Sequence, residues 1–177
     1  GGNGVEKSGY IYSAYIQYDG FKPFGVRVGA FAPLAGIEDA TGSADLIFLE
    51  RPASADIARN IAGSPGREGI SIFRQGNDYL VSLAYTGKKA TDAATFDAQQ
   101  AVVGRASWLA VNDGDVKWLL DADFSHVFKL ADTAANSNAN SFSFSNGPEL
   151  AVDATKTVGF GSGTTIPAVD ASKVTEF

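Results

Sequence analysis

Apolar and polar side chains alternate with a two-residue period along several segments of the chain, which predicts β-strands. The first segment is 8–18, SGYIYSAYIQY, and the second is 24–32, FGVRVGAFA. A DGFKP turn joins them, with glycine and proline as turn residues. In the second segment Val26 and Val28 share one face, and Arg27 lies on the other. These residues predict a hairpin with one apolar and one polar face.

Two further hairpins follow. Segments 67–75 (REGISIFRQ) and 78–87 (DYLVSLAYTG) flank Gly76-Asn77, two residue types that tolerate the positive φ of tight turns. Segments 99–111 (QQAVVGRASWLAV) and 116–129 (VKWLLDADFSHVFK) are joined by NDGD. The last segment is longer than the usual strand of about 5–6 residues. Its length is typical of a tilted strand that crosses a bilayer.

Segment 116–129 has two faces of different chemistry. One face suits an apolar medium and carries Val116, Trp118, Leu120, Ala122, Phe124, His126 and Phe128. The other carries four charges, on Lys117, Asp121, Asp123 and Lys129. Aromatic residues also end the apolar faces of the predicted strands, as in the girdles of membrane barrels; they are Tyr10, Tyr18, Tyr79, Tyr85, Trp108 and Phe128.

The long segment 32–67 lacks strand alternation. Loops beyond about 12–15 residues are usually functional or disordered, so we expect the part at about 33–66 to be an inward loop that narrows a pore. Segments 88–97 and 131–139 are small and polar and predict exposed loops. No pairing is predicted for the last segment, 148–177.

Composition excludes several classes of function. The chain has 177 residues, a net charge of -6, no cysteine and one histidine. Disulfides, thiolate metal sites and multi-histidine metal sites are therefore excluded, and we expect no cofactor. No cluster of lysine and arginine exists that would bind nucleic acid. No run of about 18 apolar residues predicts a transmembrane helix, but a β-barrel spans with alternating strands.

The pattern alone leaves two folds open. One is an antiparallel transmembrane β-barrel, and the other is a soluble or surface-exposed β-sandwich that acts as a binding module. An enzyme is not expected. Asp121 and Asp123 would lie about 6–7 Å apart on one strand face, a spacing compatible with the carboxylates of glycosidases, but lumen solvation explains them more simply.

Charged residues are the candidate pore-lining set. On polar strand faces these are Arg27, Arg74, Arg105, Lys117, Asp121 and Asp123, and in the loop they are Glu38, Asp45, Glu50, Arg51, Arg59 and Arg67. A guanidinium on the wall either offers a fork to an anionic solute or pairs with a wall carboxylate. Glu50 and Arg51 are predicted to anchor the loop. Glu38 and Asp45 could equally favour cations.

Several motifs occur in an order that resembles the phosphate-selective porins of the OprO and OprP type. They are YIQYDGFKPFGVRVGAFAPLAGIEDATGSADLIFLER at 15–51, ARNIAGSPGREGI at 58–70 and PELAVDAT at 148–155. The resemblance implies a Gram-negative outer-membrane barrel, usually a homotrimer, that passes anions such as phosphate or other small hydrophilic solutes.

The resemblance also implies a larger molecule. The chain offers about six or seven strands, fewer than the roughly eight of the smallest closed barrels. We therefore expect residues 1–177 to be a single interior section of a barrel of about 16 strands. The loop holds five acids and three arginines, which favours size restriction and mixed-charge sieving over phosphate binding.

Overall fold

The computed structural model describes most of the chain between residues 13 and 131 and short pieces beyond. The described residues are 13–33, 35–47, 51–63, 65–90, 98–131, 141–142, 144–146, 158–160, 169–170 and 173–177. Predictions for residues 8–12, 91–97 and 132–139 lie outside this part. No described helix has the length and apolar character needed to cross a membrane.

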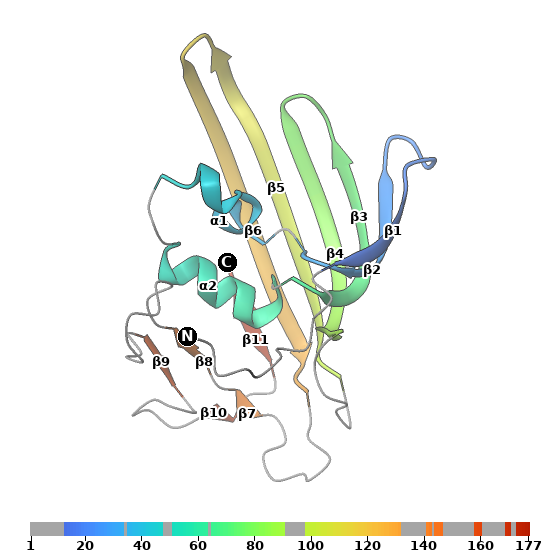
Figure 1. The fold of residues 1–177 in the computed structure, drawn as a ribbon, viewed down its shortest axis with the longest axis vertical. Coiled ribbons are helices and arrows are strands. Elements are labelled where there is room, and N and C mark those ends of the chain that lie inside the picture. The colour runs from blue at the N-terminus through green and yellow to red at the C-terminus, as the bar shows by residue number, and fades with distance from the viewer. Residues whose placement is uncertain are drawn as a thin grey trace, which may run out of the picture.

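A seven-stranded antiparallel sheet forms the body of the structure (Figure 1). In sheet order the strands are β1 (Ala14–Tyr18), β2 (Gly25–Phe31), β3 (Arg67–Gln75), β4 (Tyr79–Lys89), β5 (Gln100–Asp113), β6 (Val116–Lys129) and β11 (Val174–Glu176). The described sheet is open, with β1 and β11 at its edges. Two small ladders pair β7 (Ser141–Phe142) with β10 (Val169–Asp170), and β8 (Phe144–Asn146) with β9 (Val158–Phe160).

The three predicted hairpins are confirmed. At the β3–β4 turn, the backbone N–H of Gly76 donates to the carbonyl of Tyr79 at 2.9 Å. At the β5–β6 turn, Gly114 has a φ of +53°, a conformation that glycine adopts without the usual steric cost. β4 is longer than predicted, because Lys89 pairs with Arg67 across the ladder. Lys88 and Lys89 therefore belong to a strand and not to the predicted loop.

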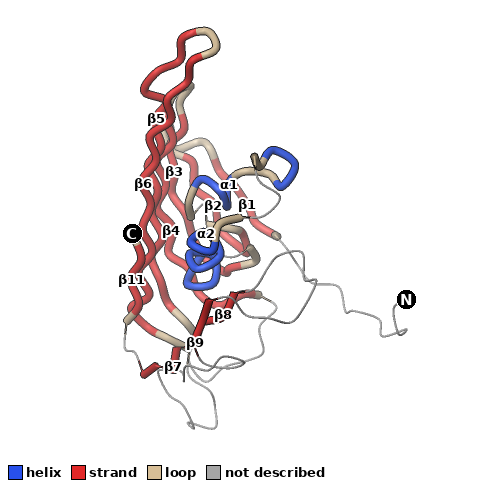
Figure 2. The backbone as a smooth tube through the Cα atoms, turned by 90° about the vertical axis from the view of Figure 1, so that its left-hand side faces the viewer, coloured by secondary structure: helices blue, strands red, loops and turns tan. Residues whose placement is uncertain are grey.

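The connection from β2 to β3 contains short helices. They are α1 (Ile37–Ala40), the 3-10 helix η1 (Ser43–Asp45), α2 (Ala53–Ala58) and the π-helix η2 (Arg59–Gly63). Figure 2 shows these helices on one side of the sheet. We call this connection the inward loop and the sheet face beneath it the loop face.

Cross-strand pairing separates the two faces of the sheet. One row of the loop face runs across Arg27, Ser71, Ala84, Val103 and Ser125. The adjacent row on the opposite face, which we call the outer face, runs across Val26, Ile72, Leu83, Gly104 and Phe124. The outer face is apolar and exposed; the exposed fractions of Ile72, Leu83 and Phe124 are 44 %, 47 % and 38 %.

The aromatic residues predicted to end the apolar faces, as far as they are described, also lie on the outer face. Tyr79 pairs with Trp108, Tyr18 pairs with Val26, and Tyr85 and Phe128 have ring centroids 6.0 Å apart. Tyr10 is outside the described residues. A soluble β-sandwich would cover such a face with a second sheet. In the described part of the chain no second sheet packs on it.

The main hydrophobic cluster joins the inward loop to the sheet. Ala35, Ile61 and Ala62 of the loop pack with strand residues of the loop face and with the residue that follows β6; these are Ala101, Val103, Val127 and Leu130. The small side chains allow the loop backbone to approach the strands closely. The loop face is therefore apolar beneath η2, although its charges had predicted a polar face throughout.

Candidate functional site

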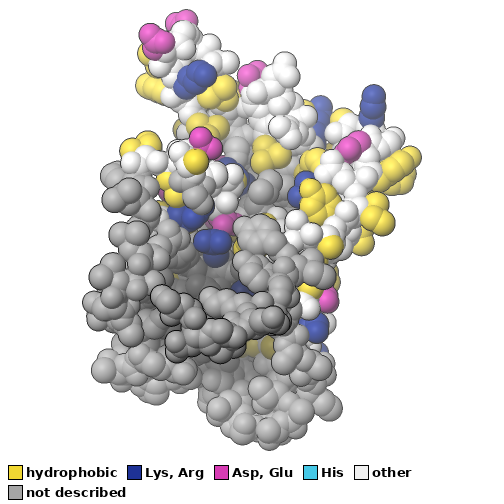
Figure 3. Space-filling model, viewed as in Figure 1, with side chains coloured by type: hydrophobic (Ala, Val, Ile, Leu, Met, Phe, Trp, Pro, Cys, Tyr) yellow, Lys and Arg dark blue, Asp and Glu magenta, His cyan; other side chains and the backbone are white. Residues whose placement is uncertain are grey.

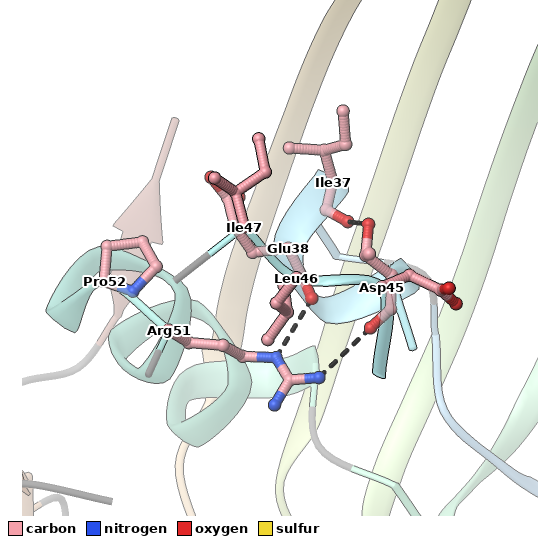
Figure 4. Close-up of a pocket in the computed structure, with 8 residues that line it drawn as sticks. Ile37, Glu38, Asp45, Leu46, Ile47, Arg51 and Pro52 are labelled. Atoms are coloured by element: carbon pink, nitrogen blue, oxygen red, sulfur yellow. Dashed lines mark hydrogen bonds between the residues drawn. The ribbon is translucent and has the colours of Figure 1, made fainter. Parts of the chain in front are cut away.

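Arg51 holds the first half of the inward loop together (Figure 4). Its Nε donates to the carbonyl oxygen of Glu38 at 3.0 Å, and its Nη2 donates to that of Thr41 at 3.1 Å. These carbonyls lie in and just after α1, where a helix end leaves carbonyls without internal partners. Arg51 thus anchors the loop through backbone carbonyls. Glu50, its predicted companion, lies outside the described residues.

Two more arginines tie the loop to itself and to the wall. Arg59 Nε lies 2.8 Å from Asp39 Oδ1, which links η2 to α1. The buried Arg67 donates to the carbonyl oxygens of Gly87 and Ile61 at 3.2 and 3.3 Å. All three loop arginines therefore have a role in holding the loop in place.

An ion pair joins β5 to β6 on the loop face of the sheet. Arg105 on β5 is buried, and its Nε lies 2.9 Å from Asp121 Oδ1 on β6. The hydroxyl of Ser107 donates to the same oxygen. Of the two roles considered for a wall arginine, Arg105 shows the structural one, since its charge is balanced by a neighbouring carboxylate.

Carboxylates face each other where α1 approaches β6. A Cβ built on Gly36, which precedes α1, would lie 3.6 Å from Asp123 Oδ2. Asp121 and Glu38 are both near enough to Asp123 for their carboxylates to repel it electrostatically, and the Arg105 guanidinium is near enough to attract it. The first turn of the loop therefore meets an acidic part of the wall. Among the described residues no group of three or more acidic or histidine side chains is arranged to hold a metal ion.

Arg27 lies on the loop face at β2, within aromatic side chains. Its Nη2 donates to Gln17 Oε1 at 3.0 Å. Its guanidinium carbon lies 4.4 Å from the ring centroid of Tyr15, with Phe73 and Phe31 at 5.4 and 5.8 Å. Arg27 forms no ion pair with a carboxylate among the described residues. Of Arg27 and Arg105, the two predicted strand arginines on the loop face, only Arg105 therefore pairs with a carboxylate in the described part of the chain.

Arg74 does not share this face, so that prediction is wrong. It pairs with Val81, which continues the outer face through Ala106, and its guanidinium carbon lies 5.4 Å from the ring centroid of Tyr79. Side chains alternate along β3, so Arg74 follows Ile70 and Ile72 and not Ser71. The alternation in REGISIFRQ already carried this signal.

The remaining predicted residues are more peripheral. Lys117 is exposed near the β5–β6 turn, and Asp45 is exposed in η1. Asp45 borders an open pocket of about 640 Å³ in the inward loop (Figure 4). The described lining of this pocket is mostly apolar and comprises Ile37, Glu38, Thr41, Asp45, Leu46, Ile47, Arg51 and Pro52. The sequence had not indicated it.

The sequence also did not indicate the partners of the charged groups. Asp39, Ser107 and Gln17 were not among the predicted residues. Asp39 and Gln17 each bind a predicted arginine, and Ser107 donates to the Asp121 carboxylate that also accepts from Arg105. Strand alternation could have placed Phe73 on the same face as Arg27. The other pairings depend on how the loop folds onto the sheet.

Comparison with known proteins places this arrangement in a family. The family model described as phosphate-selective porin O and P matches residues 1–167. The chain belongs to this porin family. The described sheet is accordingly a section of an antiparallel porin β-barrel.

A curated relative agrees with this assignment. The chain is 32% identical over 96 residues to Porin O of Pseudomonas aeruginosa, a match that covers 53% of this chain and 21% of the relative. The chain thus matches about a fifth of that porin's length. No solved structure matches the chain.

Proposed function

We propose that the protein containing this chain is a porin of the Gram-negative outer membrane, through which small hydrophilic solutes and ions diffuse passively. Residues 1–177 would form one section of the barrel, and the inward loop at about 33–66 would narrow the channel. The carrying observation is that a helical loop is docked on one face of a sheet whose other face is apolar and exposed.

The outer face supports contact with lipid. Burying a large aliphatic or aromatic side chain is worth roughly 1.5–3 kcal/mol relative to leaving it in water. Exposed outer-face residues such as Ile72, Leu83 and Trp108 would forgo that stabilisation in a water-soluble protein. A bilayer removes this cost, and it favours the aromatic residues near the strand ends.

The anchors of the inward loop support a channel of fixed width. Arg51, just before α2, holds α1, Arg59 links η2 to α1, and Arg67 ties η2 to β4. The apolar cluster then fastens η2 to β5 and β6. A loop held in this way would restrict solutes by size.

The charges support mixed-charge sieving. Glu38 and Asp123 add negative charge near β6 beyond the Arg105–Asp121 ion pair, whereas Arg27 lies on β2, four strands away in the sheet. At about 4.8 Å per strand, the two groups are roughly 19 Å apart along the wall. A solute would thus pass between a negative and a positive side of the channel.

A second candidate is preferential passage of anions such as phosphate. The family's description suggests it, and Arg27 favours it because its guanidinium has no carboxylate partner in the described part of the chain. Reversal potentials in a salt gradient distinguish the two candidates. Mixed-charge sieving predicts that Arg27→Gln shifts selectivity toward cations and Asp123→Asn shifts it toward anions, each modestly. A strong anion preference that Arg27→Gln abolishes would favour phosphate-type selectivity instead.

Planar-bilayer recording of the full-length protein tests the channel itself. Stepwise conductance from the folded protein is expected. The proposal fails if correctly folded protein produces no steps. A homotrimer is the proposed assembly, and native mass spectrometry in detergent would reveal it as a species of three times the chain mass.

A further inference from the structure

A small recess lies on the loop face where β2 passes into the inward loop. It measures about 70 Å³, which leaves room for a group of a few non-hydrogen atoms. Ala32 and Pro33, the first residues after β2, form one side of the recess, and side chains of β3, β4 and β5 form much of the rest. A solute held here would lie beside the start of the inward loop.

Arg27 is the only charged residue in the described lining of this recess. Its guanidinium is held from two sides, since Nε and Nη2 both donate to Gln17 Oε1 at 3.4 and 3.0 Å and its central carbon lies 4.4 Å from the ring centroid of Tyr15. The amide of Gln17 is itself fixed, because its Nε2 donates to both carboxylate oxygens of Asp19. Figure 3 shows hydrophobic and basic side chains next to each other over β1 and β2.

One edge of the Arg27 guanidinium remains open. Because Nε and Nη2 share the oxygen of Gln17, the edge formed by Nη1 and the second N–H of Nη2 has no hydrogen-bond partner among the described residues. Two such N–H groups match the two oxygens of a carboxylate. Arg27 can therefore bind a carboxylate through two hydrogen bonds and keep its contact with Gln17.

Two serine hydroxyls and several apolar side chains complete the recess. Ser71 lies directly opposite Arg27 on β3, and Ser82 lies on the neighbouring strand β4. Ser71 is only 8% exposed, yet neither hydroxyl has a hydrogen-bond partner in the described part of the chain. The walls around them are largely hydrocarbon and include Phe73, Leu80 and Val103.

This combination of groups favours one class of anion. A single guanidinium balances the single charge of a carboxylate, whereas a phosphate carries more than one negative charge at pH 7 and has more oxygens to satisfy. The apolar walls would also stay in contact with water beside a phosphate, but a hydrocarbon tail would cover them. The recess therefore suits an anion with one carboxylate and an apolar part.

We propose that this recess binds a monocarboxylate with a short hydrocarbon tail, with its carboxylate on the open edge of Arg27. Ser71 and Ser82 donate to the carboxylate. The tail lies against Phe73 and Leu80. The inference rests on the proposed channel and names one solute class for it. A bound solute beside the inward loop would obstruct the flow of small ions for as long as it stays.

Block of the ion current through the full-length protein in planar bilayers tests the proposal. Butyrate is titrated into a chloride solution at pH 7, and the fall in conductance gives its affinity. We expect a saturable block by butyrate. It should be tighter than the block by acetate, by up to about fourfold for each additional methylene group, and tighter than the block by inorganic phosphate.

Substitutions separate the fork, the charge and the apolar wall. Arg27→Gln should weaken the butyrate block at least about tenfold, and Arg27→Lys, which keeps the charge without the fork, should fall between Arg27→Gln and wild type. Leu80→Ala should reduce the preference for butyrate over acetate. Arg74→Gln, which removes the same charge from the outer face, is the matched control and should be blocked as wild type is.

Several results would overturn the proposal. One is a conducting channel that butyrate does not block, and another is equal block by acetate and butyrate, because the apolar wall would then have no part in binding. Block by phosphate as tight as that by butyrate would assign the recess to inorganic anions. Equal losses in Arg27→Gln and Arg74→Gln would show that overall charge alone decides the block. Each of these results overturns this inference alone, whereas absent conductance overturns the proposed function.

Discussion

Replacing Gly63 with valine should loosen the inward loop from the sheet. Gly63 ends η2, and a Cβ built on it would lie 2.7 Å from the Cβ of Ala35 and 3.2 Å from the carbonyl oxygen of Ala58. Neither atom can swing away, because one is the Cβ of a buried alanine and the other is backbone. Valine adds two further methyl groups at this contact.

The clash outweighs any gain in helix propensity. Overpacking a well-packed contact costs about 1–3 kcal/mol, whereas the change from glycine to valine favours a helix by only a few tenths of a kcal/mol. The strain is relieved if the loop leaves the sheet, since Ala35 and η2 both belong to the loop's contact with the wall. A change of about 1–3 kcal/mol raises the undocked population about 5- to 150-fold.

Hydrogen exchange of the full-length protein measures this population. Amides of α2 and η2 should exchange about 5- to 150-fold faster in Gly63→Val, while β5 amides keep their wild-type rates. Gly87→Val is the matched control, because a Cβ on Gly87 meets its nearest neighbours at an ordinary 3.6 and 3.7 Å. Unchanged exchange in Gly63→Val, or the same increase in Gly87→Val, would refute the docked arrangement.

Two further substitutions probe the ion pairs. Arg59→Gln should speed hydrogen exchange in the loop by the equivalent of about 1–3 kcal/mol, because it removes the ion pair to the largely buried Asp39 carboxylate. Adding Asp39→Asn should recover part of the loss, and no recovery would argue against the pair. Arg105→Gln should lower the free energy of unfolding of the barrel by a similar amount, and with it the urea midpoint, since Asp121 loses its buried partner. An unchanged midpoint would show that Ser107 alone satisfies Asp121.

The strands could be predicted because their signals are local. Alternation and turn chemistry are contained within a few residues, as at Gly76-Asn77, and both were enough for the three hairpins. The face of Arg74 was equally available, since it follows from counting along β3 from Ile72. The additional length of β4 was not, because it depends on the pairing of Lys89 with Arg67 across the sheet.

The inward loop could be located in the sequence but not folded from it. Its helices α1 and α2 have only four and six residues, which is too few to show helical periodicity. Its contact with the wall uses Ala35, Ala62 and Ala101, and alanines carry little pattern of their own. The roles of the loop arginines depend on this contact, so sequence alone could not distinguish structural anchors from groups that meet a solute.

Cysteine accessibility on β4 tests the central claim that the sheet separates lipid from a water-filled channel. The chain has no cysteine, so Ser82→Cys on the loop face and Leu83→Cys on the outer face each add one thiol to it. The full-length protein is placed in lipid vesicles and treated with a water-soluble, membrane-impermeant thiol reagent. We predict that Ser82→Cys reacts in the vesicles and that Leu83→Cys reacts only after detergent is added. Equal reaction at both positions, or reaction of Leu83→Cys alone, would contradict the account.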